Sequence, residues 1–159
     1  RDNRLNMIHE GTHGIQAMDL LGRKVVMNDG AGLKLLSHRI AATSARAVSS
    51  DGLASHAKAI AQAWQSVVQA TQVVWQTRDP ARAMTNAMPY MEAFGHTVVA
   101  WMWLEVALST QSLATTPQAQ GQLAAARYFW VHELPKVQAW LMPVVGQDNT
   151  CASMQDAWF

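Results

Sequence analysis

The chain has 159 residues, a net charge of +1 and a single cysteine, Cys151. A chain of this length can form one domain with a sizeable core. Charged residues make up only 14% of it and no run of Lys or Arg stands out, which argues against nucleic acid and an anionic membrane as partners. A lone cysteine cannot form an internal disulfide, which favours a reducing cytoplasm.

Seven Trp and nine Met accompany this low charge. Such side chains fill helical cores, and they are also favoured where a surface is buried against another subunit or domain. We expect most of them in the core and some at a partner surface. The longest apolar stretches, such as residues 98–104, are too short to span a bilayer. Because the chain opens on Arg1 and not on Met, we expect a piece of a longer polypeptide.

The first three predicted elements are helices separated by turn signals. A loop that contains residues 10–12 leads into a helix over about 14–26, and the Asn-Asp-Gly turn at 28–30 ends it. A second helix runs to about Val48. After the Ser-Ser-Asp-Gly break, apolar residues at helical spacing predict a third helix over 53–76.

The next predicted helix begins at Asp79, an N-cap residue followed by Pro80 at the first helical position. It is expected to continue to about Ser112. Pro89 lies inside this range and is expected to kink the helix.

Thr116 and Pro117 repeat the same start signal for the last long helix. Pro135 and Pro143 are expected to bend and end it. No strand alternation persists along the chain, so we predict an all-α fold, an antiparallel helical bundle of four long helices with short turns. The expected core anchors are its large aromatic residues, Trp64, Trp75, Trp101, Trp103, Phe129 and Trp130.

Residues 9–13 read His-Glu-Gly-Thr-His and allow two interpretations. In the first, H-E-x-x-H on a helix, His9 and His13 lie one turn apart and bind Zn²⁺ together. Glu10 is then the base that activates a metal-bound water. This interpretation predicts a zinc hydrolase.

The surrounding residues disfavour the zinc interpretation. Gly11 and Gly14 each destabilise the required helix by roughly 1 kcal/mol relative to Ala. The extended metalloprotease pattern needs Gly at position 16 and His at position 19, where the chain has Gln16 and Asp19. We therefore expect no metal and keep the hydrolase as the less favoured alternative.

The second interpretation keeps Glu-Gly-Thr at 10–12 and reads it within a longer pattern. Arg1, Asp2 and Arg4 precede it, and the run at 14–24, Gly-Ile-Gln-Ala-x-Asp-Leu-x-Gly-Arg-Lys, follows it. This segment is similar, nearly position by position, to long bacterial acyl-CoA dehydrogenases that resemble the methylthiopropanoyl-CoA enzymes. The resemblance continues at 125–137, which is similar to the "ARYF…LPK" helix of their extra C-terminal helical domain.

Two positions depart from the family pattern. Met18 stands where leucine is typical and is a conservative apolar exchange. His9 stands where tyrosine is typical, next to the catalytic glutamate of the pattern. An imidazole at this position can change the pKa or the orientation of that glutamate. The pH optimum is therefore not predicted, whereas the reaction class is.

The resemblance implies a fold, a reaction and a domain division. The expected activity is a flavin-dependent dehydrogenation that forms the α,β double bond of an acyl-CoA thioester. Residues 1–27 would end the catalytic helical domain, residues 31–150 would form the C-terminal helical bundle, and residues 151–159 would be a tail. The chain would be the last third or so of such an enzyme and inactive without its upstream domains.

The resemblance also implies roles for the motif residues. Glu10 would be the catalytic base and Gly11 would let the backbone approach the thioester. Thr12, His13 and Gly14 would contact the FAD cofactor, although the family leaves the position of His13 variable. These roles come from the family and not from the spacing of the residues.

The expected partners are the acyl-CoA substrate, the upstream flavin-binding domains, an electron-transfer flavoprotein and further copies in a homo-oligomer. The expected location is the cytoplasm. The main alternative is a non-catalytic helical interaction or oligomerisation module that keeps the motif as a remnant and binds no flavin. The sequence does not specify the acyl chain, the electron acceptor or the oligomeric state.

Overall fold

The structure is a computed structural model that describes residues 11–50, 52–113 and 115–158. Within these ranges every regular element is a helix, which confirms the all-α prediction. The longer elements are α3 (Met27–Val48), α4 (Ala54–Trp75), α6 (Ala87–Thr110), α7 (Pro117–Tyr128) and α8 (Lys136–Val145). The shorter ones are α2 (His13–Asp19), α5 (Pro80–Met84), the π-helical segments η2 (Leu20–Lys24) and η4 (Phe129–Glu133), and the 3-10 turns η3 (Gln111–Leu113) and η5 (Asp156–Trp158).

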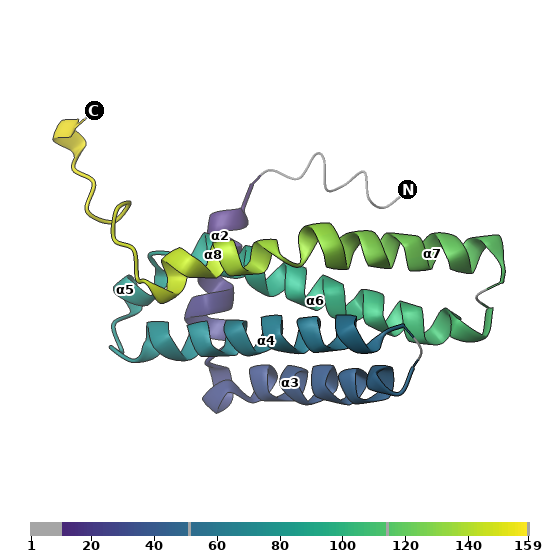
Figure 1. Ribbon diagram of the computed structural model, residues 1–159. Coiled ribbons are helices and arrows are strands. Elements are labelled where there is room, and N and C mark those ends of the chain that lie inside the picture. The colour runs from purple at the N-terminus through teal and green to yellow at the C-terminus, as the bar shows by residue number, and fades with distance from the viewer. Residues whose placement is uncertain (1–10, 51, 114, 159) are drawn as a thin grey trace.

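The long helices form an antiparallel bundle (Figure 1). Helices α3, α4 and α6 alternate in direction, and α7, η4 and α8 together form the fourth member. Helix α4 packs against α3, α6 and α8, while α6 also contacts α7. Helix α2 and segment η2 cross the bundle and pack on α6. The predicted helical bundle is therefore confirmed.

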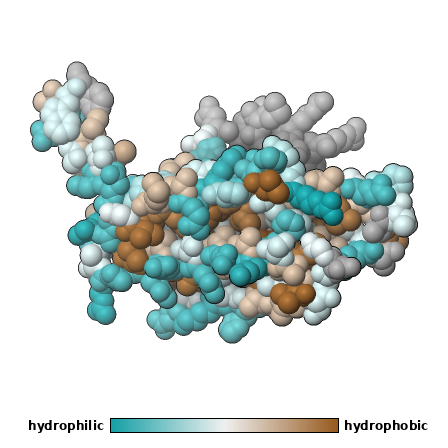
Figure 2. Space-filling model, in the orientation of Figure 1, coloured by the Kyte–Doolittle hydropathy of each residue, from teal (hydrophilic) through white to brown (hydrophobic). Residues whose placement is uncertain are grey.

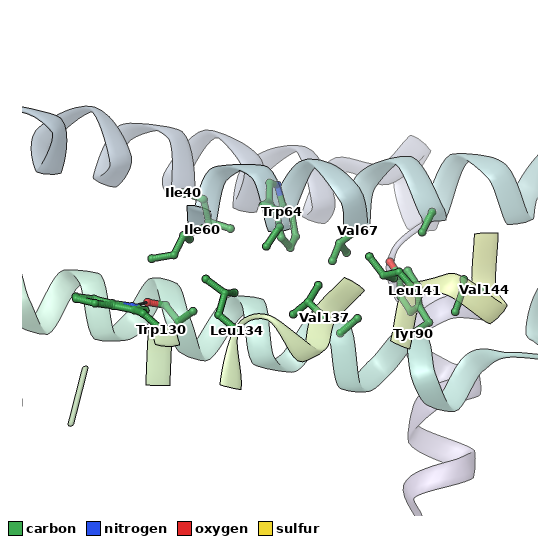
Figure 3. Packing of buried hydrophobic residues seen from close by; sticks show 14 of the residues in the cluster. Ile40, Ile60, Trp64, Val67, Tyr90, Trp130, Leu134, Val137, Leu141 and Val144 are labelled. Atoms are coloured by element: carbon green, nitrogen blue, oxygen red, sulfur yellow. Dashed lines mark hydrogen bonds between the residues drawn. The ribbon is translucent and has the colours of Figure 1, made fainter. Parts of the chain in front are cut away.

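The core lies where α4 faces α6 and the η4–α8 segment (Figure 3). Each fully buried aliphatic or aromatic side chain stabilises the fold by about 1.5–3 kcal/mol. Trp64 and Trp130 are buried as predicted. The other expected anchors are half-buried and pack against the margin of the core, namely Trp75, Trp101, Trp103 and Phe129.

The turn between the first two predicted helices lies where the sequence placed it. Asn28, Asp29 and Gly30 have φ values of 51°, 54° and 73°, in the left-handed region. Asn, Asp and Gly are the residues that tolerate this region best. They break the helical path at the start of α3, so the regular part of this helix follows Gly30.

The start signals at the two Asp/Thr-Pro pairs are also confirmed. The Asp79 carboxylate accepts hydrogen bonds from the backbone N–H groups of Ala81 (3.0 Å) and Arg82 (3.3 Å) at the start of α5. The Thr116 hydroxyl accepts one from the N–H of Ala119 (3.3 Å) at the start of α7. Both caps satisfy donors that have no partner within their helix.

The predicted kink at Pro89 is wrong. Helix α5 ends at Met84, the break falls at Thr85 and Asn86, and α6 begins at Ala87. Pro89 is thus the third residue of a new helix. Backbone N–H groups in the first turn have no acceptor within the helix, so a proline there costs no hydrogen bond.

Two π-helical segments have no counterpart in the predictions. In η2 the N–H of Val25 donates to Leu20 O (3.0 Å), which leaves Leu21 O without the partner it would have in an α-helix. The indole N–H of Trp75 donates to this oxygen at 3.2 Å. In η4 the N–H of Leu134 donates to Phe129 O (2.9 Å), just before a proline that lacks an N–H. Neither shift in register follows from hydrophobic spacing.

Among the described residues, no helix combines the length and apolar character needed to cross a membrane.

Candidate functional site

The predicted catalytic base, Glu10, and its neighbour His9 lie outside the described residues. The candidate site is therefore described from Gly11 onward. Gly11 and Thr12 precede α2, which begins at His13.

The four remaining predicted site residues form one exposed segment at the start of α2. Gly11, Thr12, His13 and Gly14 are all exposed. The Thr12 side chain makes no capping hydrogen bond, although its carbonyl accepts from the N–H of Gln16 at 2.9 Å. The Thr12 hydroxyl and the first N–H groups of α2 are thus polar groups at an exposed helix start.

The two glycines differ in their surroundings. A Cβ atom added at Gly11 would lie 3.2 Å from Nδ1 of His13, a tight contact with a side chain that can rotate. A Cβ atom at Gly14 would have no described neighbour within 4 Å. The absence of a side chain at position 14 leaves open space beside the first turn of α2.

The described half of the His-Glu-Gly-Thr-His motif lacks the geometry that a helical zinc site needs. Gly11 and Thr12 lie between the two histidines of the motif and are not helical, whereas a helical zinc site needs both of them within the helix. Within residues 11–50, 52–113 and 115–158, no three His, Cys, Asp or Glu side chains cluster as a metal site. His9 and Glu10 themselves are outside these ranges.

The bundle holds the segment in place through the apolar face of α2 and η2. Ala17 and Leu21 are fully buried, and α2 packs on α6 while η2 packs on α3, α5 and α6. Gly22 allows η2 to lie close to α5, because a Cβ added at this position would lie 2.8 Å from Sδ of Met84 on α5. The orientation of the exposed start of α2 is therefore set by packing.

A surface ion pair follows on the same helix. Arg23 Nε donates to Asp19 Oδ1 at 2.6 Å, and this hydrogen bond lowers the pKa of Asp19. The Arg23 side chain is 60% exposed and that of Asp19 is 30% exposed, so the contribution of this pair to stability is small. Ala17 and Leu21 form the buried face of this helix, while Asp19 and Arg23 lie at its surface.

A histidine cluster that the sequence did not predict joins α6 to η4 and α8. Nδ1 of His96 lies 3.1 Å from the carbonyl oxygen of Glu92, and Nε2 lies 3.5 Å from Oε2 of Glu133. Its ring packs on Phe129 and edge-on to Trp140, with centroids 5.7 and 4.5 Å apart. Glu92 lies one turn earlier on α6, but the other partners come from η4 and α8, so no local spacing in the sequence signals them.

Glu133 in this cluster is held as a carboxylate. The hydrogen bond from Lys136 Nζ (2.6 Å) is the main cause of its lowered pKa, with a smaller contribution from His96. This group joins α6 to η4 and α8. It links helices and has no described connection with the Glu-Gly-Thr segment.

A second polar cluster ties α3 to α6. Thr43 is buried, accepts a hydrogen bond from Trp101 Nε1 (2.8 Å) and donates to Glu105, which also pairs with Arg46 at 2.6 Å. Burial raises the pKa of Glu105, but the hydrogen bonds from Thr43 and Arg46 together outweigh it and hold the pKa below its usual value. This network is structural.

Comparison with known protein families identifies the bundle. Residues 36–155 match the model of the family described as "Acetyl-CoA dehydrogenase C-terminal like". The chain belongs to this family. The match covers the part of the chain from within α3 to the residues after α8, that is, the bundle itself.

This member of the acetyl-CoA dehydrogenase C-terminal-like family is also similar to the 3-methylmercaptopropionyl-CoA dehydrogenase of Ruegeria pomeroyi (strain ATCC 700808 / DSM 15171 / DSS-3). The two are 34% identical over 105 residues, which is 64% of this chain and 18% of that relative. The chain thus spans less than a fifth of the relative's length. The resemblance to the C-terminal part of long acyl-CoA dehydrogenases is confirmed.

The family match does not extend to the predicted site. It begins at residue 36, after the Glu-Gly-Thr segment and after α2. Membership in the family therefore rests on the bundle. The roles predicted for Glu10, Gly11, Thr12, His13 and Gly14 rest on the motif itself and stay predictions.

Proposed function

We propose that the chain is the C-terminal portion of a flavin-dependent acyl-CoA dehydrogenase and that it supplies the catalytic base, Glu10. The observation that supports this most is the position of the motif. Its described residues, Gly11 to Gly14, stand exposed at the start of a helix that is anchored to a bundle of the acetyl-CoA dehydrogenase C-terminal-like family. A catalytic residue needs such an arrangement, because it must be accessible and held in a fixed orientation.

The reaction removes two hydrogens across the Cα–Cβ bond of an acyl thioester. The Glu10 carboxylate takes the α proton, the electron pair of the α C–H bond forms the Cα=Cβ double bond, and hydride leaves the β carbon. A carboxylate is a weak base in water. Substrate and cofactor that exclude water from around it would raise its pKa toward the working pH and make it an effective base.

FAD, when bound, would accept the hydride. The exposed residues at the start of α2 suit such a group: the Thr12 hydroxyl is not used as a helix cap, and the space beside Gly14 is open. Hydroxyl and backbone N–H groups are donors that phosphate oxygens accept from. Thr12, His13 and Gly14 would then contact the cofactor, and Gly11 would let the backbone approach the thioester.

The proposed substrate is an acyl-CoA thioester of unspecified chain length. The upstream domains of the same enzyme would hold most of the flavin and the substrate, residues 1–27 would belong to the catalytic domain, and residues 31–150 would form the separate C-terminal bundle. An electron-transfer flavoprotein would reoxidise the flavin, the enzyme would be cytoplasmic, and copies of it would form a homo-oligomer.

The test is the Glu10→Gln substitution in the complete dehydrogenase. We expect it to abolish substrate-dependent bleaching of the flavin absorbance while FAD stays bound, because the amide cannot accept the α proton. The matched control is Glu92→Gln on α6, which should bleach as the wild type does. Bleaching retained in Glu10→Gln would remove that residue from its proposed role.

The second candidate is a helical interaction module without catalytic activity. It is favoured by one observation, namely that the family match covers the bundle and not the motif. A gene that encodes no flavin-binding domain upstream of Arg1 would support it against the dehydrogenase. The zinc hydrolase is separated from both by metal analysis of the purified protein, since only the hydrolase predicts stoichiometric zinc.

A further inference from the structure

Most of the outer face of α4 carries no charge; the one charged residue of this helix, Lys58, is exposed one turn before Gln62. From residue 59 to residue 77 the chain has no Asp, Glu, Lys or Arg, although α4 lies at the surface of the bundle. Its exposed positions in this range include five glutamines at intervals of three and four residues, which place them on one stripe of the helix. We call this stripe the glutamine ridge: Gln62, Gln65, Gln69, Gln72 and Gln76.

A hollow runs along each side of the ridge. The α3–α4 hollow has a volume of about 350 Å³ and an apolar floor that includes Ile40, Trp64 and Val68. Trp64 is held there by a hydrogen bond from its Nε1 to Ser37 Oγ at 2.9 Å. The α4–α8 hollow, of about 280 Å³, lies on the other side of the ridge.

Gln69 borders both hollows, so the two lie at the same level along α4. The far lip of the α4–α8 hollow is apolar. Met142 on α8 is 74% exposed and Val145 is 42% exposed, and both line that hollow. Figure 2 shows this side of the molecule, where hydrophobic residues are exposed among hydrophilic ones. The glutamine ridge thus has exposed apolar side chains of α8 on one side and the apolar α3–α4 hollow on the other.

This composition differs from that of a solvated helix face. The polar side of a surface helix normally carries charged residues, whereas the centre of a protein interface is depleted in Lys, Glu and Asp and enriched in Met. The ridge and its two hollows have the second character. Exposed apolar side chains beside a fixed tryptophan also gain free energy when they are removed from water.

We propose that this face binds a second copy of the chain, in a two-fold dimer whose axis runs along the glutamine ridge. Such an axis places Gln65 and Gln69 opposite their own copies and Met142 of each chain over the α3–α4 hollow of the other. A primary amide is both donor and acceptor, so identical glutamine stripes can hydrogen-bond to each other. A stripe of one charge would repel its copy. The absence of charge from residue 59 to residue 77 is therefore what a self-complementary ridge requires, and Lys58 lies outside this range, beyond the first glutamine.

This inference uses no residue of the Glu-Gly-Thr segment. It gives a surface to the homo-oligomer expected for the proposed dehydrogenase, but it holds or fails independently of the role of Glu10. A failed bleaching experiment and a failed dimer experiment are therefore distinguishable.

The test measures the mass of the purified chain by sedimentation velocity over a range of concentrations. The wild-type chain should associate to a dimer. Gln69→Glu places two carboxylates opposite each other, and Met142→Lys places a cation over an apolar hollow, so each should raise the dimer dissociation constant at least about tenfold. The matched controls are Gln120→Glu on α7 and Met102→Lys on α6, both exposed and both away from the ridge. Neither should change the association.

A mixing experiment separates the interface from an effect on folding. Gln69→Glu and Gln69→Lys should each be weakened alone, and an equimolar mixture should form a heterodimer because opposite charges then face each other. A wild-type chain that stays monomeric throughout overturns the proposal and leaves the face to a different partner. A dimer that is insensitive to both ridge substitutions, or a mixture that does not associate, also overturns it.

Discussion

Trp75 at the end of α4 donates its indole N–H to the carbonyl oxygen of Leu21, at a distance of 3.2 Å, inside the π-helical segment η2. The π register leaves that oxygen free, because the N–H of Val25 donates to Leu20 O instead. The bond therefore ties the helix that carries the candidate site to the bundle at the point where its own backbone pairing is interrupted.

Replacing Trp75 by Phe tests this tie. The variant keeps an aromatic ring but leaves the Leu21 carbonyl without its partner, which should lower the free energy of unfolding by about 1–2 kcal/mol. Urea denaturation followed by circular dichroism measures it. Trp158→Phe, in the exposed C-terminal tail, should leave the midpoint unchanged. Equal midpoints for wild type and Trp75→Phe would show that the bond contributes nothing.

Thr43→Val removes the centre of the polar cluster between α3 and α6. Valine matches threonine in shape, but Trp101 then loses its acceptor and Glu105 loses one donor. We expect a loss of about 1–3 kcal/mol, the range for unpaired buried polar groups. The control is Thr77→Val in the exposed turn after α4. Thermal and urea unfolding should place only Thr43→Val below the wild type.

Because of Tyr90, we expect the folded protein to lose stability at alkaline pH. Its hydroxyl shares a hydrogen bond with Thr71 (2.6 Å), and burial raises its pKa from 10.0 to about 12. The folded protein holds the phenol proton more tightly than the unfolded chain, so the stability from this group is complete below pH 10 and is lost as the pH rises toward 12. The loss amounts to at most about 3 kcal/mol, from roughly 1.4 kcal/mol per pKa unit.

The comparison of Tyr90→Phe with Tyr128→Phe isolates this effect. Tyr90→Phe should flatten the alkaline fall in the free energy of unfolding, and Tyr128→Phe, at an exposed position, should not. An alkaline profile of Tyr90→Phe that falls as steeply as that of the wild type would contradict the assignment.

Because of His56, we expect the folded protein to lose stability in weak acid, by less than the loss expected from Tyr90 in alkali. Its ring stacks on Trp130 with centroids 4.4 Å apart, and burial, then the charge of Arg127, lowers its pKa below 6.5. The unfolded chain therefore takes up the proton first. Stability from this group is complete above pH 6.5 and declines as the pH falls through 6.5 toward the lower folded value.

Arg127→Gln checks the second cause of that shift. It should move the NMR titration midpoint of the His56 ring upward, toward the value in the unfolded chain, while Arg39→Gln on the exposed side of α3 should not move it. An unchanged midpoint in Arg127→Gln would assign the whole shift to burial.

Local signals in the sequence were sufficient to predict an all-helical chain and where several of its helices begin or end. Some signals act within a few residues and can be recognised without knowing the fold. They include the caps at Asp79 and Thr116 and the left-handed turn at 28–30. The proline at 89 is a counterexample of the same kind. A proline kinks a helix only if the helix already extends before it. Because the chain breaks at Thr85 and Asn86, Pro89 lies in the first turn of α6 and causes no kink.

The chain's own order of residues determined that this protein is a helical bundle, and its motifs pointed to the acyl-CoA dehydrogenases, because periodicity, caps and motifs are properties of neighbouring residues. Only the tertiary structure decided which residues meet across helices, such as His96 with Glu133 and Trp101 with Thr43. It also decided that the glutamines of α4 form a ridge between two apolar hollows. The physical reason is that helix packing and register shifts depend on distant surfaces, whose relative positions no local preference specifies.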